Sequence, residues 1–158
     1  MKTFLVLGAG TAGTMIARKM ADKLYPREWK VLLVDKDENH YYQPGYLFIP
    51  FGIYQSKDVV KPKRSFIPRN IEFIISDIEL IEPDHNRVKL VNDGKVIDYD
   101  YLVIATGADI YPEETEGLKN GGWRKNIFDF YTPDGSAALA EFLKKWQGGH
   151  LVVNVVEN

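Results

Sequence analysis

A glycine turn between an apolar run and a helical pattern constrains this chain more than any other feature. Gly8, Gly10 and Gly13 have the spacing G-x-G-x-x-G and follow directly on the apolar residues 4–7. A short apolar run that ends in glycine is typical of a parallel strand buried on both faces. Apolar side chains then recur at helical spacing through residues 11–24, and a second apolar run begins at residue 31. The first 35 residues therefore predict a strand, a helix and a second strand in one βαβ unit.

The position of Asp35 gives this glycine spacing a specific physical meaning. The spacing alone is a weak signal in a sequence with 13 glycines, but Asp35 ends the second apolar run 22 residues after Gly13. Gly8 permits the tight turn, Gly10 lets the backbone approach a pyrophosphate, and Gly13 lets the helix pack closely on the sheet. The helix N-terminus would face the anion, and Asp35 would accept hydrogen bonds from an adenosine ribose. The pattern predicts a dinucleotide site, whereas a strand-turn-helix with incidental glycines does not account for Asp35.

The rest of the chain predicts an insertion and then a return to the sheet. Residues 39–56 are rich in aromatic residues and proline and predict a loop or short-helix excursion. The expected extended segments are 71–81, 87–97, 101–105 and 151–156, the expected turns are 83–86 and 92–94, and the expected helix is 136–146. The turns would join two of the extended segments into a meander. The predicted fold class is α/β, a Rossmann-like domain with a parallel sheet and an inserted antiparallel β-meander.

The composition of the chain excludes several classes of binding partner. With 158 residues, 45% of them hydrophobic, the chain fits one compact domain. A formal charge of -2 gives no general attraction to nucleic acid or to an anionic membrane, and no apolar stretch approaches the roughly 20 residues of a membrane span. The absence of cysteine excludes thiol nucleophiles and thiolate metal sites, and it fits a cytoplasmic location. Small molecules or proteins are the expected partners.

The apolar strand that ends in Ala105, Thr106 and Gly107 carries a family resemblance. Downstream of a βαβ glycine turn and a meander, such a strand resembles the FAD domain of the glutathione-reductase-like flavoproteins, the FAD-dependent pyridine nucleotide-disulfide oxidoreductases. Four stretches are similar to the branch of sulfide:quinone oxidoreductase and flavocytochrome c sulfide dehydrogenase, namely 41–44, 77–83, 98–107 and 131–135. The resemblance covers essentially the whole chain.

The resemblance implies a set of residues that bind FAD. These residues are Gly8, Gly10, Thr11, Ala12, Gly13, Asp35, Lys36, Pro44, Ile78, Ala105, Thr106 and Gly107. Ile78 would contact adenine through its backbone, Thr106 and Gly107 would border the cofactor, and Pro44 would lie near the flavin ring. No residue is assigned a catalytic role, and no metal site is expected.

The resemblance also implies an activity, electron transfer from a reduced sulfur donor through FAD to a quinone. In this branch, cysteines beside the flavin form persulfides, and this chain contains none. We therefore expect the chain by itself to be inactive. Residues 1–147 would form the FAD-binding domain and residues 148–158 would begin a second nucleotide-binding-like domain. Association into a homo-oligomer and membrane association of a longer protein are further expectations.

Three alternatives remain at this stage. Type II NADH:quinone dehydrogenases share the same FAD signals, with NADH as the electron donor. A non-catalytic FAD-binding or nucleotide-binding module would need residues 151–156 to complete a sheet. An NAD(P)-dependent reductase with one Rossmann domain is disfavoured by the meander.

The remaining polar and aromatic residues have structural interpretations. The sequence favours a solvated loop for His40, and neither His85 nor His150 indicates a metal site. The basic residues between 61 and 69 predict a solvated face, and most aromatic residues between 41 and 54 are expected to pack in a core.

Overall fold

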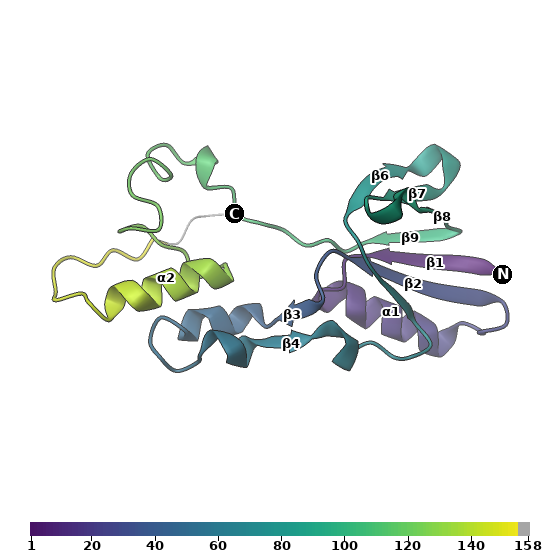
Figure 1. The fold of residues 1–158 in the computed structure, drawn as a ribbon, viewed down its shortest axis with the longest axis horizontal. Helices are drawn as coiled ribbons and strands as arrows, with labels where there is room; N and C mark the ends of the chain where they lie inside the picture. The colour runs from purple at the N-terminus through teal and green to yellow at the C-terminus, as the bar shows by residue number, and fades with distance from the viewer. Residues whose placement is uncertain (155–158) are drawn as a thin grey trace. The chain divides into compact units, whose positions relative to one another are not determined.

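The computed structural model describes residues 1–154 and divides into two compact units (Figure 1). The first unit comprises Met1–Tyr42 and Val60–Ile110, and the second comprises Gln43–Val59 and the chain from Tyr111 onward. Because the chain passes from one unit to the other more than once, each unit is assembled from segments that are distant in sequence.

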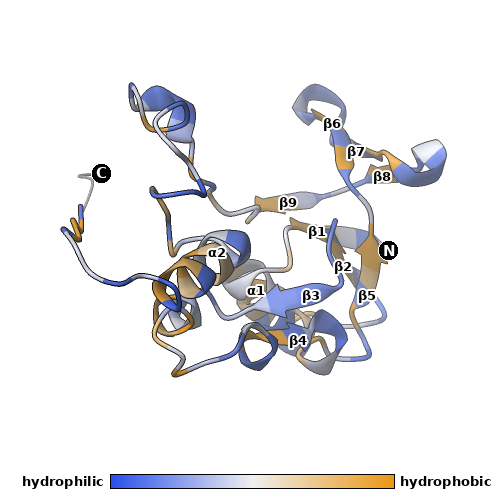
Figure 2. Ribbon diagram, turned by 60° about the vertical axis from the view of Figure 1, so that its left-hand side comes forward, coloured by the Kyte–Doolittle hydropathy of each residue, from blue (hydrophilic) through white to orange (hydrophobic). Residues whose placement is uncertain are grey.

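A parallel four-stranded sheet forms the centre of the first unit. Its strands, in spatial order, are β5 (Glu72–Ile75), β2 (Trp29–Asp35), β1 (Lys2–Leu7) and β9 (Tyr101–Ile104). All neighbouring strands are parallel, with Leu7 opposite Val34 in β2 and opposite Ile104 in β9. Figure 2 shows hydrophobic residues along β1, β5 and β9. The predicted βαβ unit and the return of residues 101–105 to this sheet are confirmed.

The helix α1 (Thr11–Lys23) covers one face of this sheet. Ala17 and Ala21 are buried against Val6 of β1 and Leu33 of β2. Small side chains on the buried stripe let the helix backbone approach the strands closely, while the polar residues of the helix face solvent.

A three-stranded antiparallel sheet covers the opposite face. It consists of β6 (Ile78–Glu82), β7 (Arg87–Leu90) and β8 (Val96–Asp98), joined by turns at 83–86 and 91–95. Val88 and Leu90 pack against Leu5 and Leu7 of β1, which alternate with Val6 because successive strand residues point to opposite faces. The predicted meander and the α/β class with a parallel sheet are confirmed.

The extended segment predicted at 71–81 is wrong as one element. It forms two strands, since β5 pairs in parallel with β2 and β6 pairs antiparallel with β7. The chain leaves the parallel sheet at Ser76, whose N–H donates to the carbonyl oxygen of Asp35 at 2.9 Å and whose Oγ accepts the N–H of Asn92 at 3.2 Å. The apolar pattern of the two strands is continuous, so it does not mark this change of sheet.

The excursion at residues 39–56 contains one paired strand and short helical turns. Strand β3 (Asn39–Tyr41) pairs antiparallel with β4 (Val60–Pro62), a pairing that the sequence does not predict. Among the described residues, the 3-10 turns are Gln43–Phe48, Ser56–Val59, Lys63–Ser65, Pro83–His85, Asn92–Gly94 and Pro112–Glu114. Of the tyrosine and phenylalanine residues between 41 and 54, Tyr46 is buried and the rest are exposed, so the expectation of core packing for most of them is wrong.

The second unit contains α2 (Pro133–Leu143), which begins three residues before the predicted helix and ends three residues before its predicted end. Thr132 caps it by accepting the N–H of Gly135 at 3.0 Å, and proline is well suited to the first helical position. Thr132 is itself held by Asp129, which pairs with Arg124 at 2.9 Å. The predicted start at residue 136 is therefore three residues too late.

The strand predicted at 151–156 is wrong for the part that can be compared. Residues 151–154 form no strand and are exposed, and residues 155 and 156 lie outside the described residues. A strand requires a partner for its backbone groups, and no described segment pairs with this one. Among residues 1–154, no helix has the length and apolar character needed to cross a membrane.

Candidate functional site

The glycine turn lies at the carboxyl end of β1, between the sheet and α1. Gly8 has a φ of +93°, and its N–H donates to the carbonyl oxygen of Val34 at 2.7 Å. A Cβ atom on Gly8 would lie 2.3 Å from the carbonyl oxygen of Ala105, and one on Gly13 would lie 1.7 Å from the carbonyl oxygen of Gly8. Glycine is therefore needed at both positions for the turn, the helix and β9 to pack together.

Gly10 differs from the other two glycines because space is open around it. A Cβ on Gly10 would meet no atom within 4 Å outside its chain neighbours. Gly10 is the N-cap of α1, and no side chain caps the helix there. The N–H groups of the first helical turn have no intrahelical acceptor, and Thr11 and Ala12 of that turn are exposed. An anionic group would fit at this helix start with the favourable end of the helix dipole.

The Asp35 carboxylate is tied to the same turn. Its Oδ2 accepts the N–H of Ala9 at 2.6 Å, and its Oδ1 accepts the N–H of Asp37 at 2.8 Å and an ammonium proton of Lys63 at 2.7 Å. A carboxylate offers about four acceptor positions, so these three bonds leave room for about one more donor. The side chain of Asp35 is 13% exposed, so it is mostly buried but not closed off from solvent.

Lys63 is a buried residue of the site that the sequence analysis missed. Its side chain is only 7% exposed, and besides Asp35 it donates to the carbonyl oxygen of Asp37 at 2.8 Å. The predicted solvated face is wrong for Lys63. No local pattern marks it, because its partner Asp35 lies 28 residues earlier in the sequence. Its neighbour Arg64 donates to the carbonyl oxygen of Phe73 at 2.8 Å and lies over the ring of Phe73.

Lys63 also contributes to the pKa of the Asp35 carboxyl. Burial by itself would raise the pKa of the Asp35 carboxyl, but the hydrogen bonds from Lys63, Asp37 and Ala9 and the charge of Lys63 together hold that pKa below its ordinary value. Asp35 is therefore ionised near neutral pH and acts as an acceptor only.

His40 is half-buried in β3, with its ring 5.3 Å from the ring of Phe66. The predicted solvated loop is wrong for this residue, because β3 pairs with β4 and carries His40 against Phe66. Burial and the charge of Lys63 both lower the pKa of His40. The imidazole is therefore mainly neutral at pH 7 and suits a packing role.

The end of β9 lies next to the glycine turn. The N–H of Ala105 donates to the carbonyl oxygen of Leu7 at 2.7 Å, and the exposed residues Thr106 and Gly107 follow. Gly107 has a φ of +81° and open space around it. The structure thus brings the Ala-Thr-Gly segment and the G-x-G-x-x-G segment together.

The other predicted residues differ in their surroundings. Ile78 opens β6, and its partly buried side chain packs with the apolar cluster between the meander and the parallel sheet. Lys36 is exposed directly after Asp35. Pro44 is exposed in the second unit, and its predicted place near a flavin ring stays a prediction.

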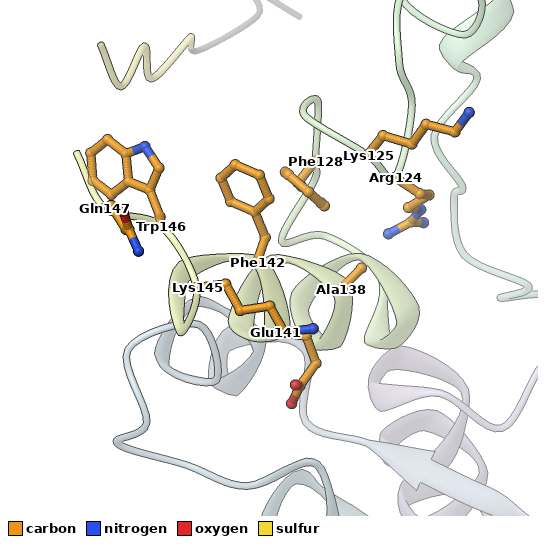
Figure 3. A pocket seen from close by; sticks show the side chains of 9 residues that line it. All are labelled: Arg124, Lys125, Phe128, Ala138, Glu141, Phe142, Lys145, Trp146 and Gln147. Carbon is orange, nitrogen blue, oxygen red and sulfur yellow. The ribbon is translucent and has the colours of Figure 1, made fainter. Parts of the chain in front are cut away.

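A separate pocket of about 520 Å³ lies over α2 within the second unit. Figure 3 shows the rings of Trp146, Phe142 and Phe128 from left to right across it, the cationic side chains of Arg124 and Lys125 beside Phe128, and Lys145 and Glu141 below Phe142. The pocket contains no glycine turn and no ionised carboxylate arranged as Asp35 is. Across residues 1–154, no group of histidine, cysteine and acidic side chains is arranged to hold a metal ion. The glycine turn with Asp35 remains the best-built site of the described chain.

Comparisons with known proteins agree with this geometry. A family described as pyridine nucleotide-disulphide oxidoreductase matches residues 2–145. A mitochondrial sulfide:quinone oxidoreductase of Dictyostelium discoideum is 31% identical over 152 residues, which is 96% of this chain and 33% of that protein. A type II NADH:quinone oxidoreductase of Staphylococcus epidermidis is 30% identical over 128 residues, which is 80% of this chain and 30% of that protein.

A solved structure gives the same result for the fold. The crystal structure of the sulfide:quinone oxidoreductase from the hyperthermophilic bacterium Aquifex aeolicus superposes with a TM-score of 0.74 at 27% identity, over 92% of this chain and 32% of that one. The present chain thus spans about a third of the length of each of these three proteins.

Proposed function

The chain belongs to the pyridine nucleotide-disulphide oxidoreductase family, and from this membership we propose that its first unit binds FAD over the glycine turn. The observation that carries the proposal is the open space around Gly10 at the uncapped start of α1. Asp35, hydrogen-bonded to the neighbouring Ala9, supports it further. An uncapped helix start suits a pyrophosphate, and a fixed, ionised carboxylate suits a ribose hydroxyl.

Each residue of the turn has a role in this proposal. The backbone N–H groups of Thr11, Ala12 and Gly13 would donate to the pyrophosphate, which Gly10 allows to approach. Asp35 would accept a hydrogen bond from the adenosine ribose at its remaining acceptor position. Gly8 and Gly13 would shape the turn, because a Cβ atom at either position would collide with neighbouring backbone.

Two further segments would line the same cofactor. The backbone at Ile78 would border the adenine, and Thr106 and Gly107 would pass close to the cofactor where the chain leaves β9. The open space at Gly107 supports this role, because a side chain there would occupy it. Lys36, exposed beside Asp35, would contribute positive charge near the phosphates.

The proposed reaction is electron transfer from a reduced sulfur donor through FAD to a quinone. Bound FAD would supply the redox centre. The protein would bind and orient it through the residues named above. The similarity to two sulfide:quinone oxidoreductases supports this assignment, and the type II NADH:quinone oxidoreductase relatives support NADH as the alternative donor. A non-catalytic FAD-binding module is the second alternative.

We extend the proposal to the organisation and location of the whole protein. Residues 1–147 would form its FAD-binding domain and residues 148–158 would begin a second nucleotide-binding-like domain, which agrees with relatives about three times as long. The whole protein would be cytoplasmic, would associate with the membrane where its quinone resides, and would form a homo-oligomer.

An absorption spectrum tests the binding proposal. Purified protein is incubated with FAD, passed through a desalting column and scanned through the visible range. Retained flavin absorption near one equivalent per chain is expected, and a colourless protein would exclude the proposal. The donor is tested anaerobically in the whole protein, because the 158-residue chain contains no cysteine and is not expected to react with sulfide. There, flavin bleaching by sulfide and not by NADH supports the sulfur donor, whereas bleaching by NADH alone supports the alternative.

A further inference from the structure

Lys63 is hydrogen-bonded, through both its side chain and its backbone, to the end of β2 and the residues that follow it. Its ammonium group donates to the Asp35 carboxylate at 2.7 Å and to the carbonyl oxygen of Asp37 at 2.8 Å. Its own N–H donates to the carbonyl oxygen of Glu38 at 2.8 Å. The side chain therefore spans from β4 and the turn after it to the end of β2, with little freedom to move.

The burial of this lysine requires an explanation. Lysine is rarely buried unless it is paired, because removing an ammonium group from water is unfavourable. Here Asp35 and the carbonyl oxygen of Asp37 both accept from the ammonium group, so the buried charge is compensated. Lys61, two residues earlier in β4, is exposed. The chain thus places one specific lysine, among several in this segment, against the carboxylate of the candidate site.

The bonds of Asp35 show what this lysine does to the site. Lys63 and the N–H of Asp37 hold Oδ1, while Oδ2 accepts the N–H of Ala9 in the glycine turn. With both oxygens held, the carboxylate plane is fixed and its remaining acceptor direction is fixed with it. Without Lys63 each oxygen would keep one backbone N–H, but Oδ1 would lose its charge-assisted hydrogen bond, so the carboxylate would be held less firmly in that direction.

We propose that Lys63 is a positioning residue for the adenosine ribose of FAD, acting through the Asp35 carboxylate. This inference rests on the proposed function. Lys63 does not touch the cofactor, and its role is to hold Asp35 in the one orientation that presents an acceptor to the ribose while also accepting from the glycine turn. The turn after β4, which carries Lys63, would therefore support the binding site without contacting the ligand.

The test measures FAD dissociation constants by flavin fluorescence in the complete 158-residue chain. Lys63→Gln keeps an N–H donor, on a side chain one atom shorter, but removes the charge, and Lys63→Met removes the donor and the charge. We expect Lys63→Met to raise the dissociation constant about tenfold, the size expected for loss of one charge-assisted hydrogen bond, with a smaller rise for Lys63→Gln. Lys61→Met removes a charge at an exposed position of the adjoining strand β4 and should change the dissociation constant less than about twofold.

A double-mutant cycle separates positioning from a merely structural role. In an Asp35→Asn background, replacing Lys63 should have almost no further effect on FAD affinity, whereas independent effects would add. Additive effects, or wild-type affinity in Lys63→Met, would overturn the inference while FAD binding itself stands. If Lys63→Met does not fold, as judged by circular dichroism, the same cycle is measured with Lys63→Gln, where wild-type affinity or additivity has the same meaning. A wild-type chain that binds no FAD would overturn the proposed function and this inference together.

Discussion

Gly13 lies so close to Gly8 that a Cβ atom at position 13 would be 1.7 Å from the Gly8 carbonyl oxygen. The close approach of these two glycine backbones packs the first turn of α1 against the end of β1. Gly10, between them, has open space around it. The three glycines of one short turn therefore divide into two that serve packing and one that leaves room for a ligand, and substitutions should separate these roles.

Replacing Gly13 with alanine should destabilise the fold. The added methyl group would have to displace backbone, because its nearest neighbour is a carbonyl oxygen. Overpacking of this kind reduces the free energy of unfolding by about 1–3 kcal/mol. Urea denaturation followed by circular dichroism measures the change. Gly10→Ala is the matched control and should stay within about 1 kcal/mol of wild type, since only the N-cap preference changes. Equal unfolding midpoints for Gly13→Ala and Gly10→Ala would contradict this use of the turn.

Replacing Gly10 with valine should abolish FAD binding and leave the fold largely intact. The side chain would occupy the space through which a pyrophosphate reaches the helix start, where a Cβ atom meets no protein atom within 4 Å outside its chain neighbours. Flavin retained after desalting is the measurement, with circular dichroism to verify folding. A folded Gly10→Val protein that keeps one equivalent of flavin would show that the pyrophosphate does not lie over this turn.

Replacing Asp35 with alanine should weaken both binding and folding. The loss of a charge-assisted hydrogen bond to ribose should reduce FAD affinity by about 1.5–3 kcal/mol. The fold should lose about 3–5 kcal/mol, since Lys63 would be left buried without its counter-ion. Titration with FAD measures the first effect and urea denaturation the second. The double variant Asp35→Ala with Lys63→Met should recover part of the stability but none of the affinity. An unchanged dissociation constant in Asp35→Ala would exclude its ribose role.

Protonation of His40 should destabilise the first unit in mildly acidic solution. Its pKa is lowered in the folded chain, so the unfolded chain binds the proton more readily. The contribution of His40 is therefore complete above its unfolded pKa of about 6.5 and is lost as the pH falls through the lower folded value. Urea midpoints measured between pH 7.5 and pH 5 should fall for wild type and fall less for His40→Gln. Parallel pH profiles for the two proteins would rule out this origin.

The sequence allowed prediction of those parts of the fold that depend on local pattern. The strand, turn and helix around Gly8 and Gly13 were predictable because their spacing reflects contacts within a few residues of one another. The return of Ala105 to the same sheet was predictable from the resemblance. Elements whose partners lie far along the chain were not, and β5 was merged with β6 because both continue one apolar pattern.

The candidate site shows the same limit. Asp35 was expected from its distance to the glycines, but Lys63, which holds it, was placed on a solvated face. Buried and exposed lysines look identical in a local sequence, and only the pairing of β3 with β4 brings Lys63 to Asp35. Likewise, the start of α2 depends on the Thr132 cap and on its link to Asp129, which the helical periodicity does not report.

The 158-residue chain, reconstituted with FAD, should not transfer electrons from sulfide to a quinone. The sequence contains no cysteine, so it has no thiol that could attack a reduced sulfur species and hold it as a persulfide beside the flavin. No alternative nucleophile among the described residues is activated next to the glycine turn, where Asp35 is ionised but already bound to Lys63.

Sulfide and a soluble quinone are added anaerobically to the reconstituted protein, and flavin bleaching and quinone reduction are followed together. Free FAD and the Gly10→Val variant serve as controls for reaction in solution. Rates equal to both controls are expected, whereas sulfide-dependent turnover well above them would show that the thiol requirement drawn from the family resemblance does not apply to this chain.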